Sequence, residues 1–109
     1  MIEMTLKYDD IRGAKELFIF GHSSGHGDQV RVGIVPRGTN KGSYYVSVFN
    51  DGFPDRYAAG GKCGLIPDSV LRDGTLGALL RFADRSIWRD GDYARLLDSR
   101  EKVDYAGLK

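Results

Sequence analysis

Two seven-residue segments, QVRVGIV at 29–35 and SYYVSVF at 43–49, most restrict what this chain can fold into. Both are rich in β-branched and aromatic residues, and turn-forming residues bound each of them. The segment between them, PRGTNKG at 36–42, suits a long hairpin loop. A parallel pair of strands would need a crossover of about a dozen residues or more. The sequence therefore predicts an antiparallel pair.

The rest of the N-terminal half also has the patterns of strands and turns. The segment IEMTLKY at 2–8 alternates apolar and polar residues, which is typical of a half-buried strand. The run LFIFG at 17–21 predicts a second short strand, and DDIRGAKE at 9–16 predicts a turn or one helical turn between them. Residues 50–64 contain four glycines and a proline, so we expect them to be irregular or only briefly paired.

The last third of the chain changes to a helical period. The segment PDSVLRDG predicts a short helix that begins near Asp68 and ends at Gly74. Further helices are predicted near 75–89 and 92–104, and Thr75 is the expected N-cap of the first of these. The helical stripe expected to pack on the sheet consists of Leu76, Leu79, Leu80, Ala83 and Ile87.

Length and composition fit one α+β domain covering residues 1–109, with strands before helices. We expect a mainly antiparallel sheet of three to five strands in the N-terminal half, packed with two or three helices from the C-terminal third. Cys63 is the one cysteine, so an intrachain disulfide is excluded. The first ten residues lack the apolar run of a signal peptide, and no stretch approaches the roughly 20 apolar residues of a membrane span. A cytoplasmic protein with no membrane partner is the expectation.

Both histidines lie in the glycine-rich stretch FGHSSGHGDQV. His22 and His26 have the i, i+4 spacing of two metal ligands on a helix, but the glycines and serines around them disfavour a helix. A hairpin loop is the better interpretation. The alternative is a metal site formed by His22, His26, Asp28 and Cys63, because ligands need not be adjacent in sequence. We expect no metal and no cofactor.

Motifs of catalysis are weak in this chain. The segment AAGGKCG superficially has the lysine of a phosphate-binding loop, but Arg56 stands where the first glycine is needed and Cys63 where Ser or Thr is needed. Neither Ser23 nor Ser24 lies in a G-x-S-x-G turn. Cys63 by itself is more typical of a small buried apolar residue than of a nucleophile. A non-enzymatic role is therefore favoured.

The strongest functional indication is a difference between the two faces of the predicted sheet, because successive side chains of a strand point to opposite sides. One face is almost wholly aliphatic and suits packing under helices. Its members are Ile2, Met4, Leu6, Leu17, Ile19, Val30, Val32, Ile34, Tyr44, Val46 and Val48. The other face mixes aromatic residues with isolated charges, as recognition surfaces do. Its members are Glu3, Thr5, Lys7, Phe18, Phe20, Arg31, Gly33, Val35, Tyr45, Ser47 and Phe49.

We therefore predict a non-catalytic protein-binding module, such as a small effector or inhibitor that occupies a partner's surface. The candidate contact residues are Phe18, Phe20, Arg31, Tyr45 and Phe49, and Tyr45→Ala and Arg31→Ala are expected to weaken binding while leaving the fold intact. One alternative is a single-strand nucleic-acid binder that stacks bases on these aromatics, although a net charge of +1 disfavours it. The other alternative is a histidine- or metal-dependent hydrolase.

Overall fold

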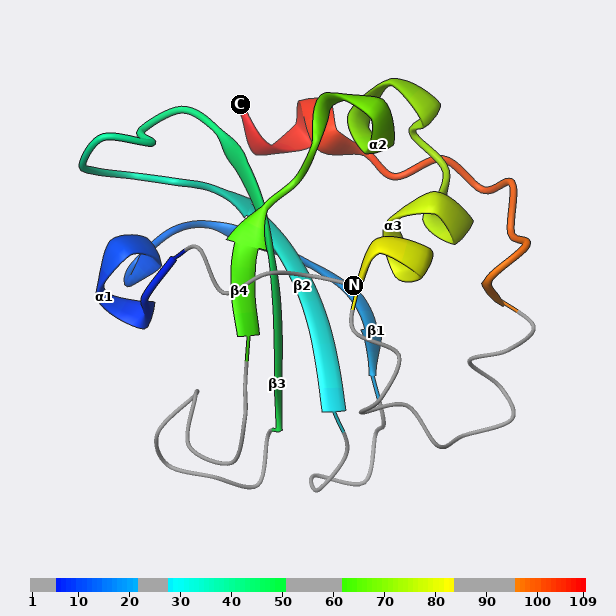
Figure 1. Cartoon of the computed structure of the whole chain (residues 1–109), viewed down its shortest axis with the longest axis horizontal. Helices are drawn as coiled ribbons and strands as arrows, with labels where there is room; N and C mark the ends of the chain where they lie inside the picture. The colour runs from blue at the N-terminus through cyan, green and yellow to red at the C-terminus, as the bar shows by residue number, and fades with distance from the viewer. Residues whose placement is uncertain (1–5, 22–27, 51–61, 84–95) are drawn as a thin grey trace.

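A four-stranded antiparallel sheet forms the centre of the computed structural model, which describes residues 6–21, 28–50, 62–83 and 96–109 (Figure 1). Within these ranges the strand order is β1-β2-β3-β4, so every neighbour in the sheet is also a neighbour in the sequence. The strands are β1 Glu16–Gly21, β2 Asp28–Ile34, β3 Tyr44–Asn50 and β4 Lys62–Leu65. The helical elements are α1 Tyr8–Ile11, α2 Asp68–Asp73, α3 Leu76–Phe82 and the 3-10 turn η2 Tyr105–Leu108. The predicted α+β class and antiparallel sheet are confirmed.

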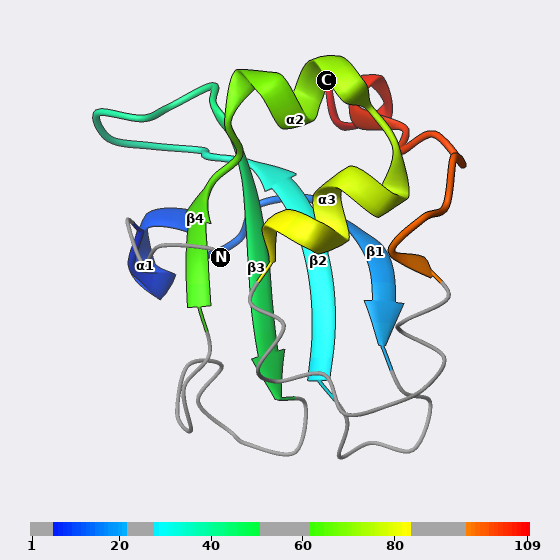
Figure 2. The same cartoon turned by 45° about the vertical axis from the view of Figure 1, so that its right-hand side comes forward.

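The aliphatic face of the sheet packs under α2 and α3, as Figure 2 shows. Val30, Val32, Val46 and Val48 are fully buried there, and their side chains follow the predicted alternation along β2 and β3. Further residues of the same cluster come from the helices and the segments that join them: Ile66, Leu79, Leu80, Ala83 and Leu108. Leu79 and Leu80 are thus core residues, as the helical period predicts.

Local signals account for the ends of α2 and α3. Gly74 has a left-handed backbone with φ of 73° and ends α2 where the sequence predicts. The Thr75 hydroxyl accepts a hydrogen bond from the Ala78 amide at 3.2 Å, so Thr75 is the N-cap of α3. The helix predicted at 75–89 is shorter than predicted where the structure describes it, because Ala83 turns to an extended backbone and α3 ends at Phe82; residues 84–89 lie outside the described residues.

The helix predicted at 92–104 is wrong over its described final part. Residues 99–104 contain no helix, and Lys102 forms an isolated antiparallel bridge with Thr75. Backbone hydrogen bonds tie this segment to the start of α3: the Leu76 amide donates to Glu101 at 2.7 Å and the Gly77 amide donates to Ser99 at 3.1 Å. These long-range bonds replace the ones that a local helix would have made.

The strand predicted at 2–8 is also wrong where the structure describes it. Tyr8 begins α1, and Leu6 precedes it outside any strand. Leu6 is buried, but in a second cluster on the other side of the sheet, not among the aliphatic residues under α3. Ile2 and Met4 lie outside the described residues.

Candidate functional site

The face of the sheet opposite α3, called here the outer face, carries three of the predicted contact residues, Phe18, Arg31 and Tyr45. In the central row of this face, Phe18 on β1 pairs with Arg31 on β2, which pairs with Ser47 on β3. Phe18 is 56% exposed and is the exposed large apolar side chain among the described residues. A phenylalanine in the middle of a strand is usually buried, so its exposure here marks a candidate contact residue.

The side chain of Arg31 is held close to Phe18. Its guanidinium carbon lies 6.0 Å from the centroid of the Phe18 ring, a cation–π arrangement. The guanidinium also donates two hydrogen bonds to the Gln29 Oε1 atom, from Nη2 at 2.9 Å and from Nε at 3.3 Å. Since Gln29 is only 7% exposed, it is a fixed support for the arginine. Phe18 and Arg31 are therefore presented as one ordered pair.

Tyr45 belongs to the same face but is fully buried, which corrects the prediction that Tyr45→Ala would leave the fold intact. Its ring lies across Gly33 of the neighbouring strand, where a Cβ atom would clash with the hydroxyl and the ring of the tyrosine. The hydroxyl then donates to the Glu16 carboxylate on β1 at 2.8 Å, and the Ser47 hydroxyl donates to the same oxygen at 3.4 Å. Gly33 therefore makes the space that hides Tyr45.

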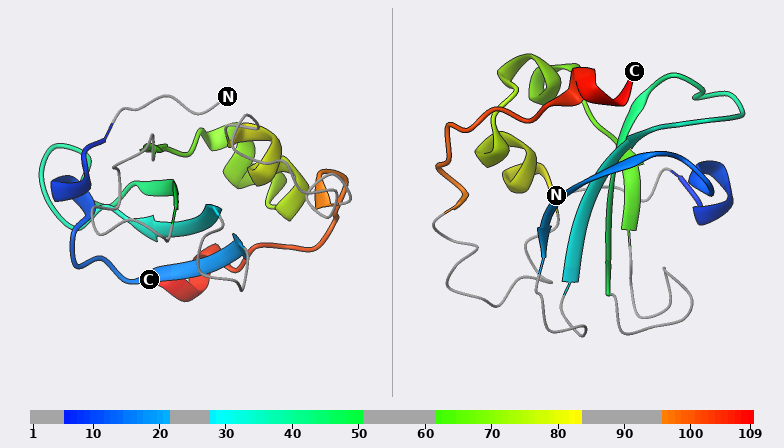
Figure 3. Two further views of the ribbon diagram at one scale, coloured as in Figure 1. Left: turned by 90° about the horizontal axis from the view of Figure 1, so that it is seen from below. Right: turned by 180° about the vertical axis from the view of Figure 1, so that it is seen from behind.

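A second hydrophobic cluster covers this part of the outer face. The turn of α1 lies beside β4, on the side away from α3 (Figure 3). The cluster consists of Leu6, Ile11, Val35, Tyr45 and Cys63. The outer face is thus divided into a covered half near β4 and an open half near β1, where Phe18 and Arg31 lie.

Phe20 and Phe49, the remaining candidates, have side chains outside the described part of the structure. Their backbone positions are described: Phe49 pairs with Gln29, and Phe20 pairs with Val30. A β-bulge between Phe18 and Phe20 shifts the register, so the strict alternation that assigned both residues to one face is interrupted there.

The alternative metal site cannot be assembled from described residues. His22 and His26 lie outside them, and Asp28 begins β2. Cys63 is fully buried within the second cluster, as expected for a small apolar residue. In the described ranges, no group of three His, Cys, Asp or Glu side chains is placed to hold a metal ion. The same ranges contain no helix that is long and apolar enough to span a membrane.

A groove of about 250 Å³ runs along the edge of the sheet beside β1. Leu17, Phe18 and Ile19 line one wall, and Leu76 with residues 101–104 line the other. Three consecutive strand residues line one cavity only where the cavity lies at the strand's edge, because their side chains alternate between faces. Sequence reasoning missed this groove because it assigned residues 101–104 to a helix.

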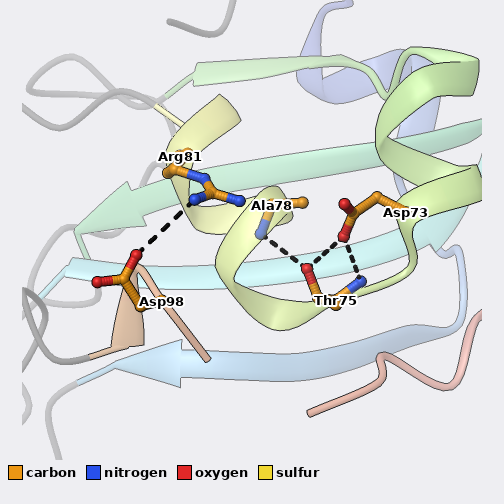
Figure 4. A network of polar contacts seen from close by, with 5 residues as sticks. All are labelled: Asp73, Thr75, Ala78, Arg81 and Asp98. Carbon is orange, nitrogen blue, oxygen red and sulfur yellow. Dashed lines mark hydrogen bonds and ion pairs between the residues drawn. The ribbon is translucent and has the colours of Figure 1, made fainter. Parts of the chain in front are cut away.

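A polar pocket of about 350 Å³ lies between α2, α3 and the C-terminal segment. Figure 4 shows its contacts: Asp73 accepts hydrogen bonds from the hydroxyl and the amide of Thr75, and Arg81 lies 3.9 Å from Asp98. The hydrogen bonds from Thr75 lower the pKa of Asp73, and the charges of Lys102 and Arg81 lower it further. These contacts fasten α2 to α3 and the C-terminal segment, so we assign the pocket a structural role.

Comparisons with known proteins leave the fold and the Phe18–Arg31 pair as the basis for a functional assignment, because no family model, curated protein or solved structure matches the chain.

Proposed function

We propose that this chain is a non-catalytic protein-binding module that acts by occupying a partner's surface through the Phe18–Arg31 pair. The observation that carries the proposal is the 56% exposure of Phe18 beside a guanidinium held by Gln29. Aromatic residues and arginine are the types most enriched among residues that dominate binding energy, where one truncation can cost about 2 kcal/mol or more.

The rigidity of the pair supports the same proposal. Phe18 and Arg31 lie on paired strands, and Arg31 is oriented before any partner arrives. Ordering a long side chain on binding costs about 0.5–1.5 kcal/mol, and a side chain that is already oriented avoids much of that cost. A preorganised surface of this kind favours recognition.

A protein partner is favoured over single-stranded nucleic acid. Nucleic-acid binders stack successive bases on several exposed aromatic rings. On the outer face, the described aromatic side chains are Phe18, which is exposed, and Tyr45, which is buried. The net charge of +1 adds little attraction for phosphates.

Photo-crosslinking tests the proposal. A photoreactive phenylalanine analogue replaces Phe18 in one variant and exposed Arg72 of α2 in a matched control. We expect one protein to crosslink at position 18 in the native cell and not at position 72, and Arg31→Ala to reduce that crosslink. Equal crosslinking at both positions, or a nucleic acid as the product at position 18, would overturn the proposal.

A further inference from the structure

The hydrogen-bonding pattern of the sheet determines the direction in which the amide and carbonyl of Phe18 point. The Val35 amide donates to the Ser43 carbonyl at 2.9 Å, which makes this pair a hydrogen-bonded one. Hydrogen-bonded pairs alternate along antiparallel strands, so Gly33–Tyr45 and Arg31–Ser47 are also hydrogen-bonded pairs. The backbone groups of Val32, between them, must then point at β1.

The same alternation determines which residues of β1 direct their backbone groups at β2. Leu17 pairs with Val32 and so directs its amide and carbonyl at β2. Phe18, the next residue, directs both of its backbone groups at the outer edge, into the groove that it lines. No hydrogen bond joins these two groups to another residue in the part of the chain that the structure describes.

The opposite edge of the sheet shows how such groups are satisfied in this fold. The same alternation points the backbone of Cys63 on β4 outward, and its carbonyl accepts a hydrogen bond from the Leu6 amide at 3.2 Å. An edge strand with unsatisfied groups is a template for another extended chain. At Phe18 none of the described residues occupies that template.

The walls of the groove define what kind of chain would fit. Leu17, Ile19, Leu76 and Val103 provide apolar surface. Among the charged lining residues, Lys102 donates its ammonium to the Asp73 carbonyl at 2.9 Å, and Asp104 accepts from the Gly107 amide. The carboxylate of exposed Glu101 has no ion pair or hydrogen bond with the described residues. A basic side chain would complement it.

We propose that the groove beside β1 binds an extended segment of a partner protein as an added β-strand. The segment pairs its backbone with Phe18, inserts apolar side chains at alternate positions and places a lysine or arginine at Glu101. The bulge after Phe18 keeps the open edge short, which limits indiscriminate pairing. This inference rests on the proposed protein-binding function and names the chemistry of the partner.

Selection of random dodecapeptides on phage against the intact chain tests the inference. We expect the enriched peptides to alternate apolar residues and to carry a lysine or arginine. In a scan that methylates one peptide amide at a time, fluorescence anisotropy should show affinity falling about three- to tenfold at every second residue of the paired segment. A period of two is the signature of strand addition.

Charge reversal supplies the matched control. Glu101→Lys should weaken the enriched peptide about fivefold or more, whereas Asp68→Lys, at an exposed carboxylate of α2 outside the groove, should leave its affinity unchanged. No enrichment, a methylation scan without the two-residue period, or equal effects of the two reversals would overturn the inference. A homodimer dissolved by Phe18→Pro would also overturn it, by making a second copy the occupant. If peptides fail to bind at the groove while the Arg31-dependent crosslink at position 18 persists, this inference is overturned and the proposed function stands.

Discussion

The two edge strands of the sheet, β4 and β1, differ in what covers their outward backbone groups. At β4, the outward carbonyl of Cys63 is hydrogen-bonded to Leu6, and Ile11 of α1 packs beside it with 1% exposure. At β1, the outward backbone of Phe18 faces a groove and its ring is 56% exposed. A stable sheet needs one covered face, and this chain also covers the half of the second face that lies near β4. The open region at β1, with Phe18 and the groove, is therefore the candidate site of function.

The same contrast divides the outer face. Tyr45 reaches across Gly33 to Glu16 and closes the end of the face that α1 covers. Arg31 instead leans on Gln29 and the exposed ring of Phe18. The Glu16 carboxylate thus accepts a hydrogen bond from the hydroxyl of the buried Tyr45 ring, whereas the Arg31 guanidinium lies beside the exposed Phe18 ring. Three sets of variants test this comparison.

The largest expected difference is between Ile11→Ala at the covered edge and Phe18→Ala at the open one. Ile11 is buried, so its truncation should lower the free energy of unfolding by about 2–5 kcal/mol. Phe18→Ala should change it by less than about 1 kcal/mol, because the ring is mostly in solvent. Urea unfolding followed by circular dichroism measures both values. Similar losses in the two variants would show that the open edge is as structural as the covered one.

A pair of proline substitutions tests the orientation of β1. Leu17→Pro removes an amide directed at β2 and leaves a buried carbonyl of Val32 without its donor, so a loss of about 1–3 kcal/mol is expected. Phe18→Pro removes an outward amide, which an edge strand tolerates. Thermal unfolding of both variants measures the difference. The reverse order of stabilities would mean that Phe18 faces β2, and the groove would then lack its backbone donor.

The smallest effect is expected at Tyr105, which follows the C-terminal wall of the groove. Burial, together with the charge of Asp73, raises the pKa of Tyr105 to about 12. Because the folded pKa is above the unfolded value of 10.0, ionisation of Tyr105 leaves stability unaffected below about pH 10 and lowers it as the pH rises from there through about 12.

Tyr105→Phe removes this ionisable group and, with it, a buried hydroxyl that has no hydrogen-bond partner among the described residues. Stability near neutral pH should therefore be unchanged or slightly higher, and the variant should lose less stability between about pH 10 and about pH 12 than the natural chain does. Urea unfolding across this range provides the measurement. A clear loss at neutral pH would indicate that the hydroxyl is bonded after all.

Much of the fold could be predicted because its signals are local. The alternation in 29–35 and 43–49 predicts β2 and β3, and the aliphatic row under α3 follows from it. Gly74 and Thr75 mark a helix end and a helix start by their own backbone and side-chain chemistry. The candidate site was predicted in part: Phe18 and Arg31 meet on the outer face, whereas Tyr45 is buried.

By itself, then, the sequence determined the antiparallel sheet, its aliphatic face and the assignment of Phe18 and Arg31 to the opposite face, since these depend on a short loop and on the two-residue period of strands. Only the tertiary structure decided the rest. Residues 99–104 have a helical pattern, but their carbonyls accept from the amides that begin α3, and Gly77 leaves room for that approach. Tyr45 is hidden because Gly33 on another strand lacks a side chain. Such contacts join residues far apart in the chain, and no local period carries information about them.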